Sequence, residues 1–139
     1  MPADGFQTPD QLRALAQRLA DAADSYADRL RSEAANMTSD QIYPRLQEDQ
    51  RLRGMANQLF FEASNHTISE ALPGQTELDG TLTKAADKIK KFQRFENALE
   101  IVADLIALAG AVLAGKPGPV IAAIDEVAKD VAKADDAAA

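Results

Sequence analysis

Residues 99–124 read LEIVADLIALAGAVLAGKPGPVIAAI, and this stretch decides the fold class. From Leu105 onward, Ile, Val, Leu and Ala occupy nearly every face of a helix, and the run lacks the strict alternation of a half-buried strand. Gly115 and Pro117 interrupt it, because glycine suits the end of one helix and proline suits the first turn of the next. We therefore expect a helical hairpin over residues 99–131, in which a short C-terminal helix folds back on the helix before it.

The apolar pattern continues upstream of the hairpin at spacings of three and four residues. Its positions are Leu82, Ala85, Ile89, Phe92, Leu99, Val102, Ile106 and Leu113. Such spacing places apolar side chains on one face of a helix. Continued from Thr81 to Gly115, the pattern predicts one long third helix of roughly 34 residues, about 50 Å at 1.5 Å per residue.

The first helix is predicted to begin at a threonine. Thr8 and Gln11 have the spacing of a capping box, and Pro9 suits the first helical position. Apolar residues then recur every three or four positions, so the helix should run to about Asn36.

Two signals conflict at the start of the second helix. Thr38 and Gln41 repeat the capping box, but Pro44 lacks an N–H and clashes with the preceding turn of a helix. We expect a turn or kink there, with the main second helix beginning at Pro44. Pro73 and Gly74 should end the helical pattern, and residues 74–80 should form a loop.

The composition favours helices over sheets. Hydrophobic residues make up 46% of the chain but aromatic residues only 5%, and Trp and Cys are absent. With 139 residues, the chain is expected to form one domain over 1–139, with 1–7 and 134–139 frayed. We predict an all-α, up-down bundle of three to four helices with the long third helix and the short C-terminal helix described above.

Charge and hydropathy suggest the compartment and exclude one class of partner. The net charge of -7 repels nucleic acid, so no nucleic-acid partner is expected. The first residues lack the basic start and apolar segment of a signal peptide. The longest run without a charge, Leu105 to Gly115, is shorter than the ~18 to 20 residues of a membrane span. We expect a cytoplasmic protein without a transmembrane helix, with non-classical export left open.

No arrangement of residues typical of catalysis is visible. His66, the only histidine, has Glu62 and Glu70 four residues to either side, but di-iron bundles need a second histidine. Glu96, Glu100 and Asp104 form an acidic row on helix three, and Asp125, Glu126 and Asp130 recur on helix four. Acidic side chains are rarely buried, which favours solvated faces for both rows. We expect no enzyme activity, no cofactor and no metal.

Two surfaces remain as candidates for contact with other molecules. Lys84, Lys88, Lys91 and Arg94 form a basic turn and a half that an anionic partner could use, although a solvated face explains it as well. Phe60 and Phe61 are adjacent, so on a helix they point about 100 degrees apart and one of them can lie outside the core.

The hairpin suggests the function. A helix that is apolar all round must be buried or in lipid, and two other helices would cover only part of it. We expect a non-enzymatic protein that self-associates as a homo-oligomer, or binds a protein partner, through the 99–131 hairpin. The predicted contact residues are Leu105, Leu108, Val112, Leu113, Val120 and Ile121. The alternative is a membrane-active protein that inserts this hairpin into a bilayer, against the cost of Glu100, Asp104 and Asp125.

Overall fold

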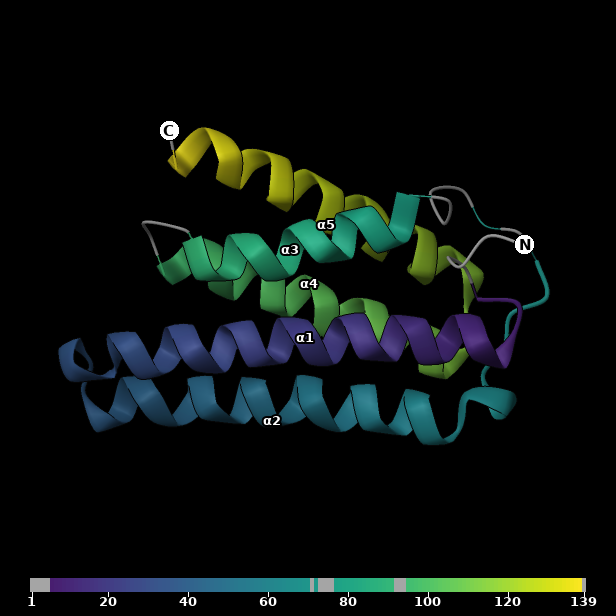
Figure 1. Cartoon of the computed structure of the whole chain (residues 1–139), viewed down its shortest axis with the longest axis horizontal. Helices are drawn as coiled ribbons and strands as arrows, with labels where there is room; N and C mark the ends of the chain where they lie inside the picture. The colour runs from purple at the N-terminus through teal and green to yellow at the C-terminus, as the bar shows by residue number, and fades with distance from the viewer. Residues whose placement is uncertain (1–5, 71, 73–76, 92–94, 139) are drawn as a thin grey trace.

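The computed structural model describes residues 6–70, 72, 77–91 and 95–138, and of 133–138 the backbone alone. Over these residues the chain is helical and contains no strand, which confirms the all-α prediction. The helices are α1 (Pro9–Glu33), α2 (Ser39–Phe61), α3 (Leu78–Lys91), α4 (Phe95–Ala114) and α5 (Pro117–Ala138), with short 3-10 turns at Ala34–Asn36 and Ala63–Asn65. Consecutive helices run in opposite directions along the long axis of the molecule (Figure 1).

Both predicted capping boxes form. The Thr8 hydroxyl accepts a hydrogen bond from the Gln11 backbone N–H at 3.1 Å, and the Gln11 side chain accepts one from the Thr8 N–H at 3.1 Å. The Thr38 and Gln41 pair repeats this arrangement at 3.3 and 3.0 Å. Each box therefore satisfies two backbone N–H groups at a helix start that have no partner within the helix.

The predicted start of the second helix at Pro44 is wrong. The helix α2 begins at Ser39, directly after the Thr38 box, and Pro44 lies inside it. Proline in this position removes a single helical hydrogen bond, from its own nitrogen to the Asp40 carbonyl. The capping box and the packing of α2 on α1 outweigh that loss.

The prediction of one long third helix is also wrong. The range holds two helices, α3 and α4, which run antiparallel and contact each other (Figure 1). Phe92 and Arg94, which the prediction placed on the continuous helix, lie outside the described residues. A spacing of three and four residues appears equally in one helix and in two helices that share a core, so periodicity alone did not distinguish them.

The hairpin between α4 and α5 forms where glycine and proline predict it. Gly115 has a φ of 68°, its N–H donates to the Val112 carbonyl at 3.0 Å, and the Lys116 N–H donates to the Ala111 carbonyl at 3.3 Å. This pair of bonds is the Schellman ending of a helix, in which glycine adopts the left-handed conformation at little cost. Pro117 then begins α5, whose 22 residues exceed the 20 of α4, so the C-terminal helix is not short.

Fraying was expected over residues 1–7 and 134–139, and the structure differs from this expectation at both ends of the chain. Phe6 is fully buried, and its carbonyl accepts a hydrogen bond from the Ile68 N–H at 2.7 Å. The backbone of α5 continues helical to Ala138. Residues 1–5 and 139 lie outside the described residues.

The apolar helix α4 contacts each of the other four helices. Its buried residues are Ala98, Ile101, Val102, Leu105, Ile106, Leu108, Ala109 and Val112. Because α3 and α5 supply two further neighbours, the apolar faces of α4 that α1 and α2 leave open are buried within the chain itself.

Candidate functional site

The residues predicted as contacts in the hairpin lie in or against the core of the bundle. Leu105, Leu108, Val112 and Val120 are fully buried, while Leu113 and Ile121 are half-buried and pack against the same core. In the folded chain these six side chains therefore offer little surface to another molecule. An association through them requires the hairpin to open.

The predicted basic surface is only partly assembled. Lys84 is exposed, Lys88 is half-buried, and Lys91 is exposed with its ammonium 3.2 Å from the Asp87 carboxylate. Arg94 lies outside the described residues. An exposed pair such as Lys91 and Asp87 stabilises a helix only slightly, as expected for a solvated face.

His66 and its acidic neighbours do not share one helix face. The helix α2 ends at Phe61, and His66 follows the 3-10 turn after it. The His66 Nε2 lies 3.2 Å from the Glu62 carboxylate, whereas Glu70 is in the irregular segment beyond. The common helix face that a metal interpretation of these three residues requires is therefore absent.

A different group of carboxylates comes together between α4 and α5. One oxygen from each of Asp104, Glu126 and Asp130 lies within 4.8 Å of the other two, a spacing at which three carboxylates can share one cation. Here this group is called the α4–α5 acidic cluster. Glu126 is exposed, Asp104 and Asp130 are half-buried, and the Asp104 Oδ2 is buried without a hydrogen-bond partner.

Asp104 departs from the predicted solvated face, because one of its carboxylate oxygens is closed to solvent. Burial raises the pKa of its carboxyl to about 8, with further contributions from the neighbouring Asp130 carboxyl and from the charges of Glu126 and Glu100. Asp104 therefore keeps its proton to a higher pH than an exposed aspartate does. The signal in the sequence was its position within the apolar helix, but the neighbours that shift its pKa most come from α5.

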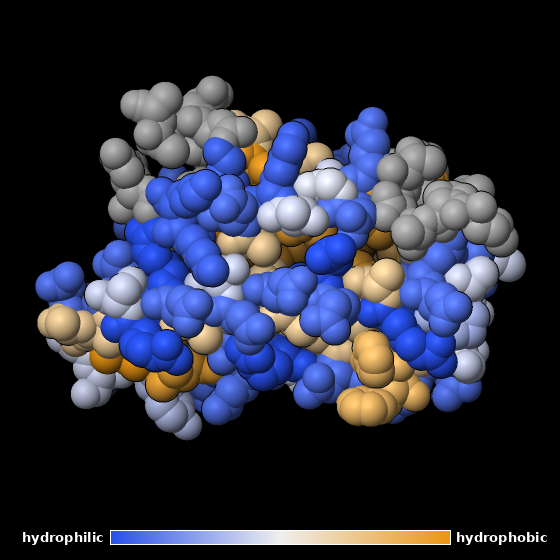
Figure 2. Space-filling model, viewed as in Figure 1, coloured by the Kyte–Doolittle hydropathy of each residue, from blue (hydrophilic) through white to orange (hydrophobic). Residues whose placement is uncertain are grey.

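The outer face of α2 carries the exposed large apolar side chains of the described residues. They are Phe61, Tyr43, Leu46 and Phe60, with exposed fractions of 82%, 66%, 44% and 40%. Figure 2 shows apolar surface toward both ends of this helix, with hydrophilic surface between. Of the two phenylalanines that the sequence singled out, neither is in the core.

A regular stripe runs along this outer face. It consists of Tyr43, Gln47, Gln50, Gly54, Asn57 and Phe61, which are all exposed and which alternate in steps of four and three residues. The stripe lies opposite the buried residues Leu52, Ala56 and Leu59 and is about 27 Å long. We call it the α2 seam, because this spacing is the one by which two helices pack side by side.

The α2 seam contains no charged residue, although 27% of the chain is charged. Arg51 and Arg53 border it, about 80 degrees to either side of its centre line. Depletion of charge and enrichment in aromatic residues distinguish the centre of protein interfaces from ordinary surface. The sequence contained this signal, but only the exposure of the stripe separates it from an ordinary polar helix face.

One helix also meets the dimensions of a membrane span. Among the described residues, the helix α4 is long and apolar enough, and less than half of its most apolar stretch is buried in the bundle. The expectation that no helix reaches this length came from counting charge-free residues only. Glu100 and Asp104 interrupt α4 without lowering its mean hydropathy below that of a spanning helix.

The function of this chain is inferred from its residues and its fold, because known proteins offer no match. The chain matches no protein-family model, no curated protein and no solved structure.

Proposed function

We propose that this chain is a non-enzymatic interaction protein that self-associates through the α2 seam. The observation that carries the proposal is the exposed, charge-free stripe from Tyr43 to Phe61 in a protein of net charge -7. Water solvates charged side chains better than it solvates this stripe, so burial of the seam costs less than burial of other surfaces.

A second copy of the chain is the partner that fits the seam. Two α2 helices can pack antiparallel about a two-fold axis that crosses the seam at the level of residue 52. Tyr43 of each copy then lies opposite Phe61 of the other. Gln50 then lies opposite Gly54, where the missing side chain leaves open space. The pattern of large residues at both ends and small or amide residues between them is self-complementary.

The size of the seam sets the strength of the association. A stripe about 27 Å long and about 10 Å wide covers roughly 300 Å² per copy, well below the ~800 Å² of a standard interface. We therefore expect a reversible dimer that forms at high micromolar concentration rather than an obligate one.

Sedimentation velocity between about 10 µM and 1 mM tests the proposal. We expect the parent chain to show a monomer–dimer equilibrium that Gln50→Glu abolishes, because the substitution places like charges in the seam. Ala122→Glu, which adds the same charge to an exposed position of α5, is the matched control and should still dimerise. A parent chain that stays monomeric at the highest concentration would refute the proposal.

Because the chain has no cysteine, crosslinking can test the orientation without background. Gln47→Cys and Asn57→Cys should form a mixed disulfide when combined, and neither should crosslink readily with itself. Self-crosslinking of each variant would indicate parallel helices and contradict the antiparallel arrangement.

A second candidate function is insertion of the 99–131 hairpin into a bilayer. Two observations favour it: α4 has the length and hydropathy of a spanning helix, and the raised pKa of Asp104 makes its carboxyl easier to protonate than an exposed one. A neutral Asp104 lowers the cost of placing α4 in lipid, since an ionised carboxylate costs a few kcal/mol there.

Dye release from zwitterionic phosphatidylcholine vesicles, which do not repel an acidic chain, tests this candidate. We expect the parent chain to release dye and Ala107→Asp not to, because residue 107 is exposed in the bundle but lies near the middle of α4. The variant should still fold and dimerise, so a loss of release would be specific to lipid. Equal release by parent and variant, or none by the parent, would exclude insertion of this helix.

A further inference from the structure

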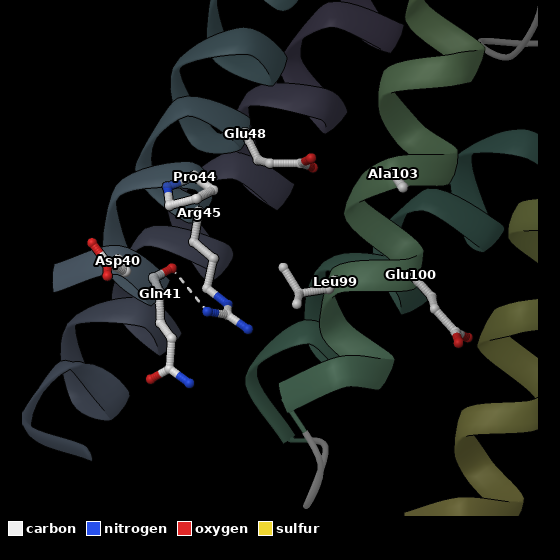
Figure 3. Close-up of a pocket in the computed structure, with 8 residues that line it drawn as sticks. All are labelled: Asp40, Gln41, Pro44, Arg45, Glu48, Leu99, Glu100 and Ala103. Carbon is white, nitrogen blue, oxygen red and sulfur yellow. Dashed lines mark hydrogen bonds between the residues drawn. The ribbon is translucent and has the colours of Figure 1, made fainter. Parts of the chain in front are cut away.

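A cleft of about 560 Å³ separates the N-terminal halves of α2 and α4 (Figure 3). Its apolar lining comes from Pro44 on α2 and from Leu99 and Ala103 on α4. The volume lies within the range of roughly 300 to 1,000 Å³ that is typical of small-molecule sites. The cleft is on a different face of α2 from the seam, so its role is independent of self-association.

Two oppositely charged side chains of α2 extend into the gap. Figure 3 shows Arg45 and Glu48 pointing from α2 toward α4, with the guanidinium near Leu99. Glu48 has no ion-pair partner among the described residues, and neither have Asp40 and Glu100 at the margins of the cleft. The cleft thus presents one cationic and one anionic group from positions three residues apart on α2, with an excess of negative charge around them.

Arg45 has hydrogen-bonding capacity to spare. Its Nη1 donates to the Gln41 carbonyl at 2.8 Å, and its guanidinium carbon lies 5.3 Å from the centre of the Phe95 ring. The Nε is buried without a hydrogen-bond partner. A buried donor without an acceptor costs about 1 to 3 kcal/mol, so its persistence needs an explanation.

A second buried donor without a hydrogen-bond partner is a tyrosine hydroxyl beside Phe95. Tyr26 on α1 is fully buried, its ring is 5.9 Å from Phe95, and its hydroxyl has no partner. Burial raises the pKa of this hydroxyl, and the charge of the Glu48 carboxylate adds to the effect. The Tyr26 hydroxyl does not line the cleft and, like the Arg45 Nε, is closed to solvent, so the donors that the cleft offers a ligand are the terminal guanidinium nitrogens of Arg45.

We propose that the α2–α4 cleft binds a free amino acid with an apolar side chain. Arg45 supplies donors for the carboxylate, Glu48 accepts the ammonium, and Leu99 with Pro44 and Ala103 contacts the side chain. A free amino acid carries both charges on one carbon, as Arg45 and Glu48 on the same side of the cleft require, whereas a peptide has its two charged ends far apart. The excess carboxylates make the ammonium the more important of the two charges.

Three ligands with the same phenyl group separate the contributions of charge. L-phenylalanine has both charges, 2-phenylethylamine only the ammonium and 3-phenylpropionate only the carboxylate. Titration of the full chain, followed by backbone amide chemical shifts, should show L-phenylalanine binding at least tenfold more tightly than 3-phenylpropionate and several-fold more tightly than 2-phenylethylamine.

Substitutions assign each charge to a residue. Glu48→Gln should weaken the two ammonium ligands about tenfold and leave 3-phenylpropionate unaffected, while Arg45→Gln should weaken L-phenylalanine but not 2-phenylethylamine. Ala103→Leu fills the cleft from an exposed position and should abolish binding of all three without unfolding the chain. Glu70→Gln, an exposed carboxylate outside the cleft, is the matched control and should bind like the parent.

Each alternative result counts against the proposal. Equal affinity for the three ligands would mean an apolar cleft without recognition of charge, and 2-phenylethylamine binding most tightly would mean a site for organic cations. Absence of shift changes at Leu99 and Ala103 at saturating L-phenylalanine would mean that the cleft is not a site for amino acids.

Discussion

Replacement of Asp104 by asparagine should change how stability depends on pH. In the folded chain the pKa of Asp104 is raised from 3.8 to about 8 by burial and by Asp130, Glu126 and Glu100. Between about pH 4 and pH 8 the folded protein therefore holds a proton that the unfolded chain has released. Stability contributed by the protonated carboxyl is lost as the pH rises through this window and changes no further above about pH 8.

The magnitude follows from the size of the shift. At about 1.36 kcal/mol per pKa unit, a shift from 3.8 to about 8 sets an upper limit near 6 kcal/mol. Glu126 is exposed and the other two members of the α4–α5 acidic cluster are half-buried, so water screens the repulsion. We expect about 2 to 3 kcal/mol after this screening. The asparagine side chain is neutral at every pH. The stability of Asp104→Asn relative to the parent should therefore increase by that amount as the pH rises from 5 to 9.

Urea denaturation followed by circular dichroism at 222 nm measures the difference at each pH. The difference in unfolding free energy between Asp104→Asn and the parent should rise from pH 5 to pH 8 and then level off. Asp125→Asn, which removes an exposed acid of α5 outside the cluster, is the control for the loss of one negative charge and should change the stability less than Asp104→Asn does. If the Asp104→Asn difference does not vary with pH, the carboxyl is not protonated in the folded chain and the reasoning fails.

Four further substitutions test the packing, each by urea denaturation. Leu108→Ala and Ile106→Ala should both cost about 2 to 5 kcal/mol, because both side chains are buried, and a Leu108 variant as stable as the parent would contradict its place in the core. Gly115→Ala should destabilise the chain by about 1 kcal/mol through its φ of 68°, although a new methyl group meets no atom there. Tyr26→Phe should be neutral or stabilising, since it removes a buried hydroxyl without a partner; a marked loss of stability would mean that the hydroxyl is bonded.

The features that the sequence predicted correctly are local. Thr8 with Gln11 and Thr38 with Gln41 form their capping boxes, and Gly115 ends α4 as its place before Pro117 suggested. Each depends on hydrogen bonds between residues at most five positions apart. Such bonds form in nearly the same way whatever packs around them, which is why residue type and spacing were enough.

The features that the sequence missed depend on residues far apart in the chain. The chain reverses direction between α3 and α4, so two helices that share a core replace the one long helix that was predicted. The spacing of apolar residues is the same in both cases and does not distinguish them. Burial of Leu105 and Leu108 followed from that choice, because α3 and α5 cover faces of α4 that would otherwise need a partner.

By itself the sequence determined that the chain is helical, where α1 begins and where the last hairpin turns, since these follow from local hydrogen bonding and apolar spacing. Only the tertiary structure decided which polar and apolar groups meet water. It packed Asp104 against the acids of α5, left the α2 seam exposed and placed α4 across the cleft from Arg45 and Glu48. Burial and electrostatic environment are set by the neighbouring helices, and a single sequence does not state which helices those are.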